Sequence, residues 1–116
     1  MDTITFSDFE KIDIRIGTVV EVSVPEWSHW VMKIVVDFGE ELGTKVCFSG
    51  IMKFFTPEDL KGKQYPFVIN MAPKKIGPEG DMSECMMIMA VEKDDEDTPP
   101  VMFNMEKAVP NGTKVR

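Results

Sequence analysis

The segment Thr56-Pro57-Glu58-Asp59-Leu60-Lys61-Gly62 predicts a short α-helix and marks both of its ends. Thr56 is a preferred N-cap residue, and Pro57 follows at the first helical position, where its missing N–H has no helical partner to lose. Asp59 lies three residues after the cap, and Gly62 is typical of a C-terminal stop. Because this is the only clear helix signal in the chain, it gives a reference point for the elements on either side.

Apolar runs with a period of two, the period of a strand, lie on both sides of this helix. In the first run, Ile12, Ile14 and Ile16 alternate with polar or small residues, and apolar residues continue to Val22, which predicts a long, bent strand. Further strands are predicted at residues 32–38, 45–49, 65–71 and 85–91. The last is almost continuously apolar, as expected of a strand that is covered on both sides.

This order of elements predicts an all-β fold, a five-stranded oligonucleotide-binding (OB) Greek-key barrel with its short helix between strands 3 and 4. Such barrels bind ligands over strands 2 and 3 and through the loops that join strands 1 to 2 and 4 to 5. Here those loops fall at residues 23–30 and 72–84, and the second is expected to be irregular because it holds two prolines and two glycines. The Ser7-x-x-Glu10 spacing predicts one more turn of helix before the barrel.

The length of 116 residues predicts a single domain. We divide it into a barrel at 9–91, an acidic loop at 92–100 and a C-terminal extension at 101–116. No apolar run approaches the roughly 18 residues of a membrane span, and no secretory signal is evident, so we expect a cytoplasmic protein. The formal charge is −7, but five acids and one base at 92–97 account for most of it, so the remainder is nearly balanced.

Candidate catalytic and metal-binding groups are scarce. His29 is the only imidazole, and no nucleophile or base signature accompanies it. Cys47 and Cys85 form no CxxC pair, so we expect both to be reduced and buried, with neither a disulfide nor a zinc site. The acidic run at 92–97 lacks the ligand spacing and central glycine of an EF-hand, which favours a solvated charge run. We therefore predict a protein that is not an enzyme and holds no metal and no cofactor.

Aromatic and basic side chains lie on the two loops that an OB barrel presents to a ligand. Trp27 and Trp30 lie in the first loop, and unpaired bases stack on such rings at about 1–3 kcal/mol each. A ring could equally close the end of the barrel or be buried in a subunit contact. Lys74 and Lys75 lie in the second loop, although two adjacent lysines are also common without a function. The other candidates for phosphate contact are Arg15, Lys33, Lys45 and Lys53.

Four short motifs add a resemblance to this interpretation. They are Asp13-Ile14-Arg15-Ile16-Gly17, Phe48-Ser49-Gly50-Ile51, Asn70-Met71-Ala72-Pro73 and Ser83-Glu84-Cys85-Met86. In order and spacing they resemble the tRNA-binding domain family, OB domains found at the C-terminal end of methionyl-tRNA synthetases and as free-standing homodimers. The resemblance implies tRNA binding through the barrel face, with Ser83 and Met86 at the binding edge. It also implies a twofold dimer built partly from the N-terminal turn and the extension.

Within that family the chain most resembles the CsaA-type branch, free-standing dimers described as export-related chaperones. The resemblance lies in Asp37-Phe38-Gly39, Met82-Ser83-Glu84 and residues 54–60. It implies unfolded polypeptides as an alternative to tRNA or another structured RNA. The chain departs from the family where rings replace a basic residue of the first loop and where Cys85 replaces a glycine. With the acidic total, these departures predict weak RNA binding that falls quickly with salt.

Overall fold

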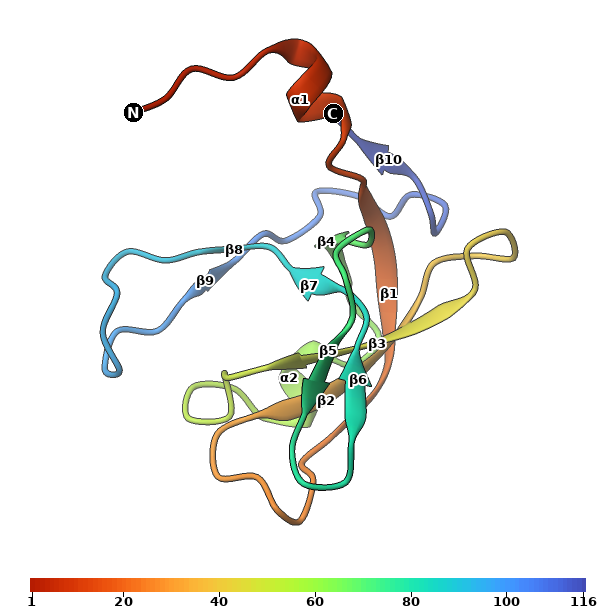
Figure 1. The fold of residues 1–116 in the computed structure, drawn as a ribbon. Helices are drawn as coiled ribbons and strands as arrows, with labels where there is room; N and C mark the ends of the chain where they lie inside the picture. Colours follow the sequence, from red (N-terminus) through yellow and green to blue (C-terminus); the bar gives the residue numbers. More distant parts are fainter.

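The computed structural model describes residues 1–116 and shows one antiparallel sheet wrapped into a small barrel (Figure 1). The strands follow the path β3-β2-β1-β4-β7. Their bounds are β1 Ile14–Ser23, β2 Met32–Asp37, β3 Thr44–Ser49, β4 Gln64–Val68 and β7 Met86–Met87. Helix α2 (Pro57–Leu60) lies between the third and fourth strands of the barrel. The predicted OB fold is therefore confirmed.

Strand β1 is the long, bent strand that the sequence predicts. Its first half pairs with β4, its second half pairs with β2, and the register shifts between Val19 and Glu21. A bulge of this kind bends a strand and increases its twist, which lets one strand take part in both walls of a closed barrel.

Ser83 and Glu84 close the barrel against the free edge of β3. The Glu84 N–H donates to the carbonyl of Val46 at 2.7 Å, and the Val46 N–H donates to Oε1 of Glu84 at 3.1 Å. The Phe48 N–H donates to Oγ of Ser83 at 3.2 Å. These bonds satisfy backbone groups that would otherwise form an open sheet edge.

The core lies inside this barrel. Phe38 and Phe67 meet edge to face, with ring centroids 5.4 Å apart. Cys47 and Cys85 are both free and buried in the same cluster, as predicted. A hydrogen bond with the Cys85 thiol, together with burial, raises the pKa of Cys47. The alternation along β2 places three more side chains in the core: Met32, Ile34 and Val36.

The C-terminal extension is attached to the rest of the fold at three places. Strand β9 (Val101–Met102) pairs with β8 (Met89–Ala90), and β10 (Lys114–Val115) pairs with the start of β1. Between them, the side chain of Gln64 donates to the carbonyl of Val109 at 2.7 Å and accepts from its N–H at 3.0 Å. The extension is therefore an integral part of the fold.

The two helices differ in how well the sequence predicts their starts. Helix α2 is capped as expected, because the Asp59 carboxylate accepts from the N–H of Thr56 at 2.7 Å. Helix α1 (Phe6–Glu10) begins after Thr5, whose extended backbone lets its Oγ1 accept from the N–H of Asp8 at 3.1 Å. The predicted cap at Ser7 is wrong, because Ser7 already lies inside the helix. Neither helix is long and apolar enough to cross a membrane.

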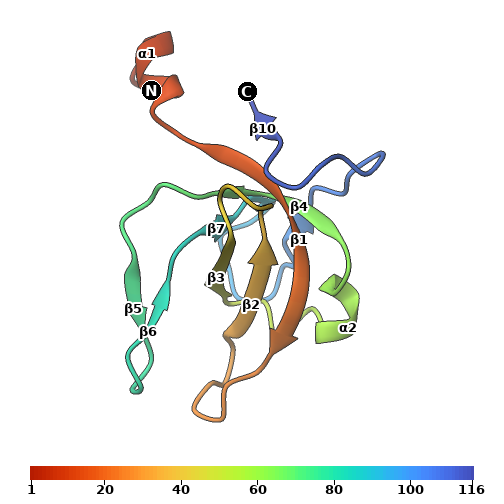
Figure 2. The same ribbon diagram turned by 90° about the vertical axis from the view of Figure 1, so that its right-hand side faces the viewer.

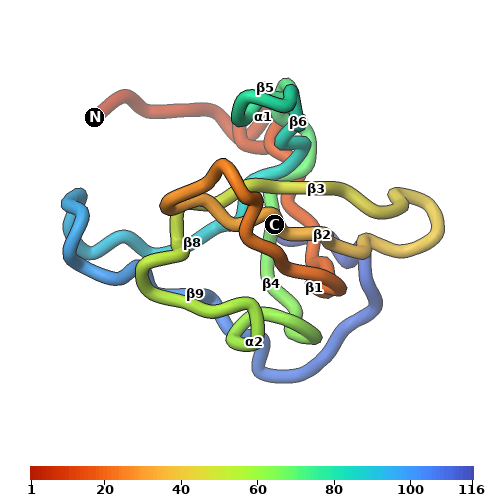
Figure 3. The backbone as a smooth tube through the Cα atoms, turned by 90° about the horizontal axis from the view of Figure 1, so that it is seen from below, coloured from red at the N-terminus to blue at the C-terminus, as the bar shows by residue number.

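Three predicted segments need correction. Residues 72–84 are not irregular: they form a hairpin of β5 (Lys74–Ile76) and β6 (Asp81–Ser83) around a turn rich in glycine and proline. The strand predicted to reach residue 71 ends at Val68. The Ile69 N–H still donates to the carbonyl of Asp13, but the Asp13 N–H donates to the side chain of Asn70 and not to a backbone carbonyl. The segment 85–91 breaks into β7 and β8, and it is covered only in part because Met86 is exposed. The hairpin and α2 lie on opposite sides of the barrel (Figures 2 and 3).

Candidate nucleic-acid interface

A pocket of about 220 Å³ opens between β3 and the β5–β6 hairpin. Three of the predicted binding residues line it: Lys74, Ser83 and Met86. Its apolar wall includes Phe48 and Ile76. The pocket therefore combines a cation with apolar surface on the side of the barrel where OB folds bind their ligands.

Phe48 connects this pocket to the first loop. Lys33 lies directly opposite Phe48 in the β2–β3 ladder, so both side chains are on the outer face of the sheet. On the other side, the Trp27 ring centroid is 6.3 Å from that of Phe48. Phe48 was not among the predicted site residues. The signal was available, since a buried Cys47 requires its neighbour in the strand to face outward.

The two tryptophans have different environments. Trp30 has 64% of its surface exposed and lies beside Gly50 at the end of the barrel. Trp27 is half-buried, and its Nε1–H is buried without a hydrogen-bond partner. Trp30 is therefore the more open ring on which a base could stack, whereas Trp27 is partly covered by the protein.

Arg15 is engaged within the protein, away from the pocket. Its Nε lies 2.7 Å from Oδ1 of Asp13, and its Nη1 donates to the carbonyl of Gly112 at 3.0 Å. The half-buried guanidinium thus joins β1 to the C-terminal extension.

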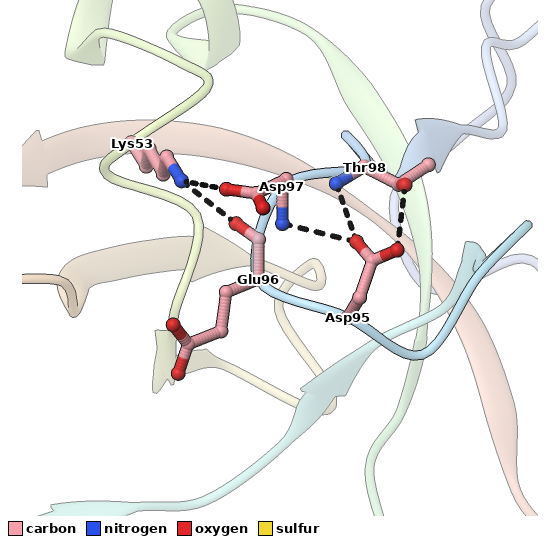
Figure 4. Close-up of polar contacts among 5 residues, drawn as sticks. All are labelled: Lys53, Asp95, Glu96, Asp97 and Thr98. Atoms are coloured by element: carbon pink, nitrogen blue, oxygen red, sulfur yellow. Dashed lines mark hydrogen bonds and ion pairs between the residues drawn. The ribbon is translucent and has the colours of Figure 1, made fainter.

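Lys53 is bound by the acidic loop (Figure 4). Its Nζ lies 2.8 Å from Oδ1 of Asp97 and donates to the carbonyl of Glu96 at 3.0 Å. The Asp97 carboxylate raises the pKa of Lys53, and Lys53 in turn lowers the pKa of Asp97. Hydrogen bonds from Thr98 lower the pKa of Asp95, whose carboxylate accepts from the Thr98 N–H at 2.7 Å. The acidic run is exposed, but it is ordered around Lys53.

The other predicted cations have no carboxylate within ion-pair distance. The chain forms three ion pairs, and these involve Lys11, Arg15 and Lys53. Lys75 lies opposite Met82 on the hairpin, next to Lys74 in the strand, and Lys45 lies opposite Val36 towards the far end of β3. No group of three histidine, cysteine or acidic side chains is arranged to hold a metal ion.

The family model described as tRNA binding domain matches residues 14–114. The chain belongs to the tRNA-binding domain family. It is 39% identical over 111 residues to the methionine–tRNA ligase of Cupriavidus necator, a match that covers 94% of this chain and only 16% of that protein. The chain therefore spans about a sixth of the length of that relative, and it spans a similar share of other methionine–tRNA ligases that it matches.

Two solved structures of similar size have the same fold. The MetRS-related protein from Pyrococcus horikoshii superposes with a TM-score of 0.86 at 29% identity and covers all of both chains. Chaperone CsaA from Bacillus anthracis strain Ames superposes with a TM-score of 0.82 at 34% identity and covers 99% of this chain and 100% of that one.

In this member of the tRNA-binding domain family, the motif residues make contacts that build the fold. The Asn70 side chain accepts from the Asp13 N–H at 2.9 Å, which holds the start of β1 against the end of β4. A Cβ on Gly17 would lie 2.5 Å from Cγ1 of Val36 and 2.7 Å from Cε1 of Phe38, so only glycine fits there without movement. These two motifs therefore specify architecture, whereas Phe48, Ser83 and Met86 of the other two line the pocket.

Proposed function

We propose that this chain is a non-catalytic, cytoplasmic RNA-binding module that binds tRNA or a similarly structured RNA over β2, β3 and the β5–β6 hairpin. Membership of the tRNA-binding domain family supports this proposal. The observation that carries it is the position of two lysines that have no ion-pair partner: Lys74 lines the pocket beside Phe48, called the Phe48 pocket below, and Lys33 lies opposite Phe48 in the β2–β3 ladder. No ion pair has to break before these amines meet phosphate, which favours binding despite the acidic total.

The pocket has room for one flat group and not for a double helix. We therefore infer that the amines contact the backbone while an unstacked base from a loop or a single-stranded end lies against Phe48. Trp30 offers a second, separate ring at the end of the barrel.

Salt-dependent binding tests this function. If three to five phosphates are neutralised, the logarithm of the association constant for total tRNA should fall with log salt at a slope of about −2 to −4. Lys74→Glu/Lys75→Glu should abolish most of this binding. The matched control is Lys61→Glu/Lys63→Glu, an equal charge change on exposed lysines next to α2, on the side away from the hairpin. A slope near zero, or equal losses in both variants, would refute RNA binding at this face.

Unfolded polypeptide is a second candidate partner. It is favoured by the similarity to chaperone CsaA and by the exposed methionines at and near the pocket, Met71, Met82 and Met86. Methionine-rich surfaces adapt to varied apolar side chains. Competition between labelled tRNA and a denatured protein at two salt concentrations separates the candidates. The polypeptide is favoured if the denatured protein displaces tRNA at low salt only and if Lys74→Glu/Lys75→Glu captures the denatured protein as well as the unchanged chain does.

We propose further that the protein is a homodimer. Helix α1 has no buried residue, and Phe6 on it has 70% of its surface exposed. Phe103 in the C-terminal extension is also exposed. A second copy that covers these side chains would remove apolar surface from water. Sedimentation equilibrium should show a dimer that Phe6→Asp dissociates and that Val24→Asp, a change at an exposed loop residue, leaves intact.

A further inference from the structure

The Trp27 ring occupies the space beside the turn of the β5–β6 hairpin. A Cβ built on Gly77 would lie 2.4 Å from Cζ2 of Trp27 and 2.6 Å from its Cε2. The ring therefore packs directly on the backbone of Gly77, and its centroid also lies 6.3 Å from that of Phe48 in β3. One side chain from the first binding loop thus connects the hairpin turn to the barrel wall.

The hairpin has little else to hold its far end. Strands β5 and β6 form a separate two-stranded sheet, and their bonds to β3 are made at Ser83 and the following residue. Isolated two-stranded hairpins are marginally stable in water, so a contact at the turn has a large effect on how often the hairpin departs from the barrel.

We propose that Trp27 is a positioning residue that holds the β5–β6 hairpin over β3 and so keeps Lys74 beside the Phe48 pocket. This inference rests on the proposed RNA-binding function. It differs from the expectation that Trp27 stacks on a base, because the ring is already covered by the hairpin. The indole N–H is buried without an acceptor, so packing alone holds the ring, and the donor is not offered to a ligand.

A double-mutant cycle with total tRNA distinguishes positioning from direct contact. Trp27→Ala and Lys74→Ala/Lys75→Ala should each weaken binding, and the combined variant should bind no more weakly than the lysine variant alone. Trp27→Phe should restore most of the affinity because a ring still fills the site. Losses that add in the combined variant would overturn the proposal and assign Trp27 a direct contact with RNA.

Tryptic cleavage after Lys74 and Lys75 measures hairpin opening without RNA. Cleavage of a transiently opened segment follows its population, so Gly77→Ala should accelerate it by at least about fivefold. Gly80→Ala is the matched control, since both glycines have positive φ, +75° and +78°, but a Cβ at Gly80 meets only Cε of Lys75 at 3.4 Å. Trp30→Phe leaves Trp27 as the only tryptophan, so its fluorescence reports on this contact. In that background, Gly77→Ala should shift the Trp27 emission to longer wavelength and Gly80→Ala should not. The thermal unfolding midpoint should stay nearly constant in both.

Equal cleavage rates in the two glycine variants would refute the positioning role, whatever the RNA result. If the hairpin loosens as expected but tRNA affinity is unchanged by every variant, the positioning of the hairpin stands and the proposed RNA-binding function fails. The two conclusions are therefore separable.

Discussion

Charged and polar side chains are bonded within the protein in one region of this barrel, and lysines are left without ion-pair partners in another. At the motif end, formed by residues 13–17, Asn70 and the segment 109–115, side chains bond to the protein itself: Arg15 to Asp13 and Gly112, and Asn70 to the Asp13 N–H. At the hairpin face, formed by Trp27, Lys33, Phe48 and the β5–β6 hairpin, the lysines have no ion-pair partner and apolar side chains are exposed.

This contrast indicates where a ligand is expected to bind. A cation already paired inside the protein contributes to stability, and a phosphate could recruit it only by breaking that pair. An unpaired lysine is hydrated and can meet phosphate with release of counterions. The motif end is therefore suited to architecture and the hairpin face to binding, although family motifs occur in both: residues 13–17 and Asn70 in the first, Phe48 and Ser83 in the second.

The largest expected effect is on stability at the motif end. Gly17→Ala should lower the free energy of unfolding by roughly 2–3 kcal/mol, because the new methyl group would overlap the buried side chains of Val36 and Phe38. Gly50→Ala, where the nearest atom is 3.5 Å away, is the control and should be nearly neutral. Urea denaturation measures both. Equal stability of the two variants would remove the packing argument for Gly17.

One substitution in each region separates an effect on stability from an effect on binding. Arg15→Ala should lower the free energy of unfolding by about 1–2 kcal/mol, since a half-buried carboxylate and a carbonyl lose their partner. It should leave tRNA affinity within about twofold, equal to less than 0.5 kcal/mol. Lys33→Ala should do the reverse and weaken binding with little change in stability. Filter binding measures the affinity of both variants, and urea denaturation measures their stability. If Arg15→Ala weakened tRNA binding without lowering stability, the assignment of the motif end to architecture would be contradicted.

The smallest expected effect concerns the acidic loop. Because Lys53 lowers the pKa of Asp97 from its usual value, their contact stabilises the loop above the carboxyl's ordinary pKa of 3.8 and is lost as pH falls through the lowered value. Lys53→Ala should return the pKa of Asp97 towards its ordinary value. The pKa of Asp95 should stay low, because Thr98 and not Lys53 is its main cause. Carboxyl NMR titration measures both, and parallel shifts would contradict the assignment.

Local patterns predicted the elements of the barrel well. The cap residues of α2, the alternation of β2 and the length of β1 depend on neighbours within a few residues, so the sequence encodes them directly. The hairpin in residues 72–84 was missed because glycine and proline suggest irregular loops, whereas here they build the turn of a short hairpin. Likewise, Thr5 and Ser7 are both acceptable N-cap residues by type. Thr5 is the cap because its backbone is extended, whereas Ser7 already lies in the helix.

The sequence alone predicted the order of the barrel strands, the place of helix α2, the burial of Cys47 and Cys85 and membership of the tRNA-binding domain family. Which candidate side chains are free depends on the tertiary structure. Arg15 meets Gly112 across 97 positions of the chain, and Lys53 meets Asp97 across 44. Composition and periodicity describe neighbours along the chain, whereas the availability of a charge depends on distant residues that folding brings within a few ångströms.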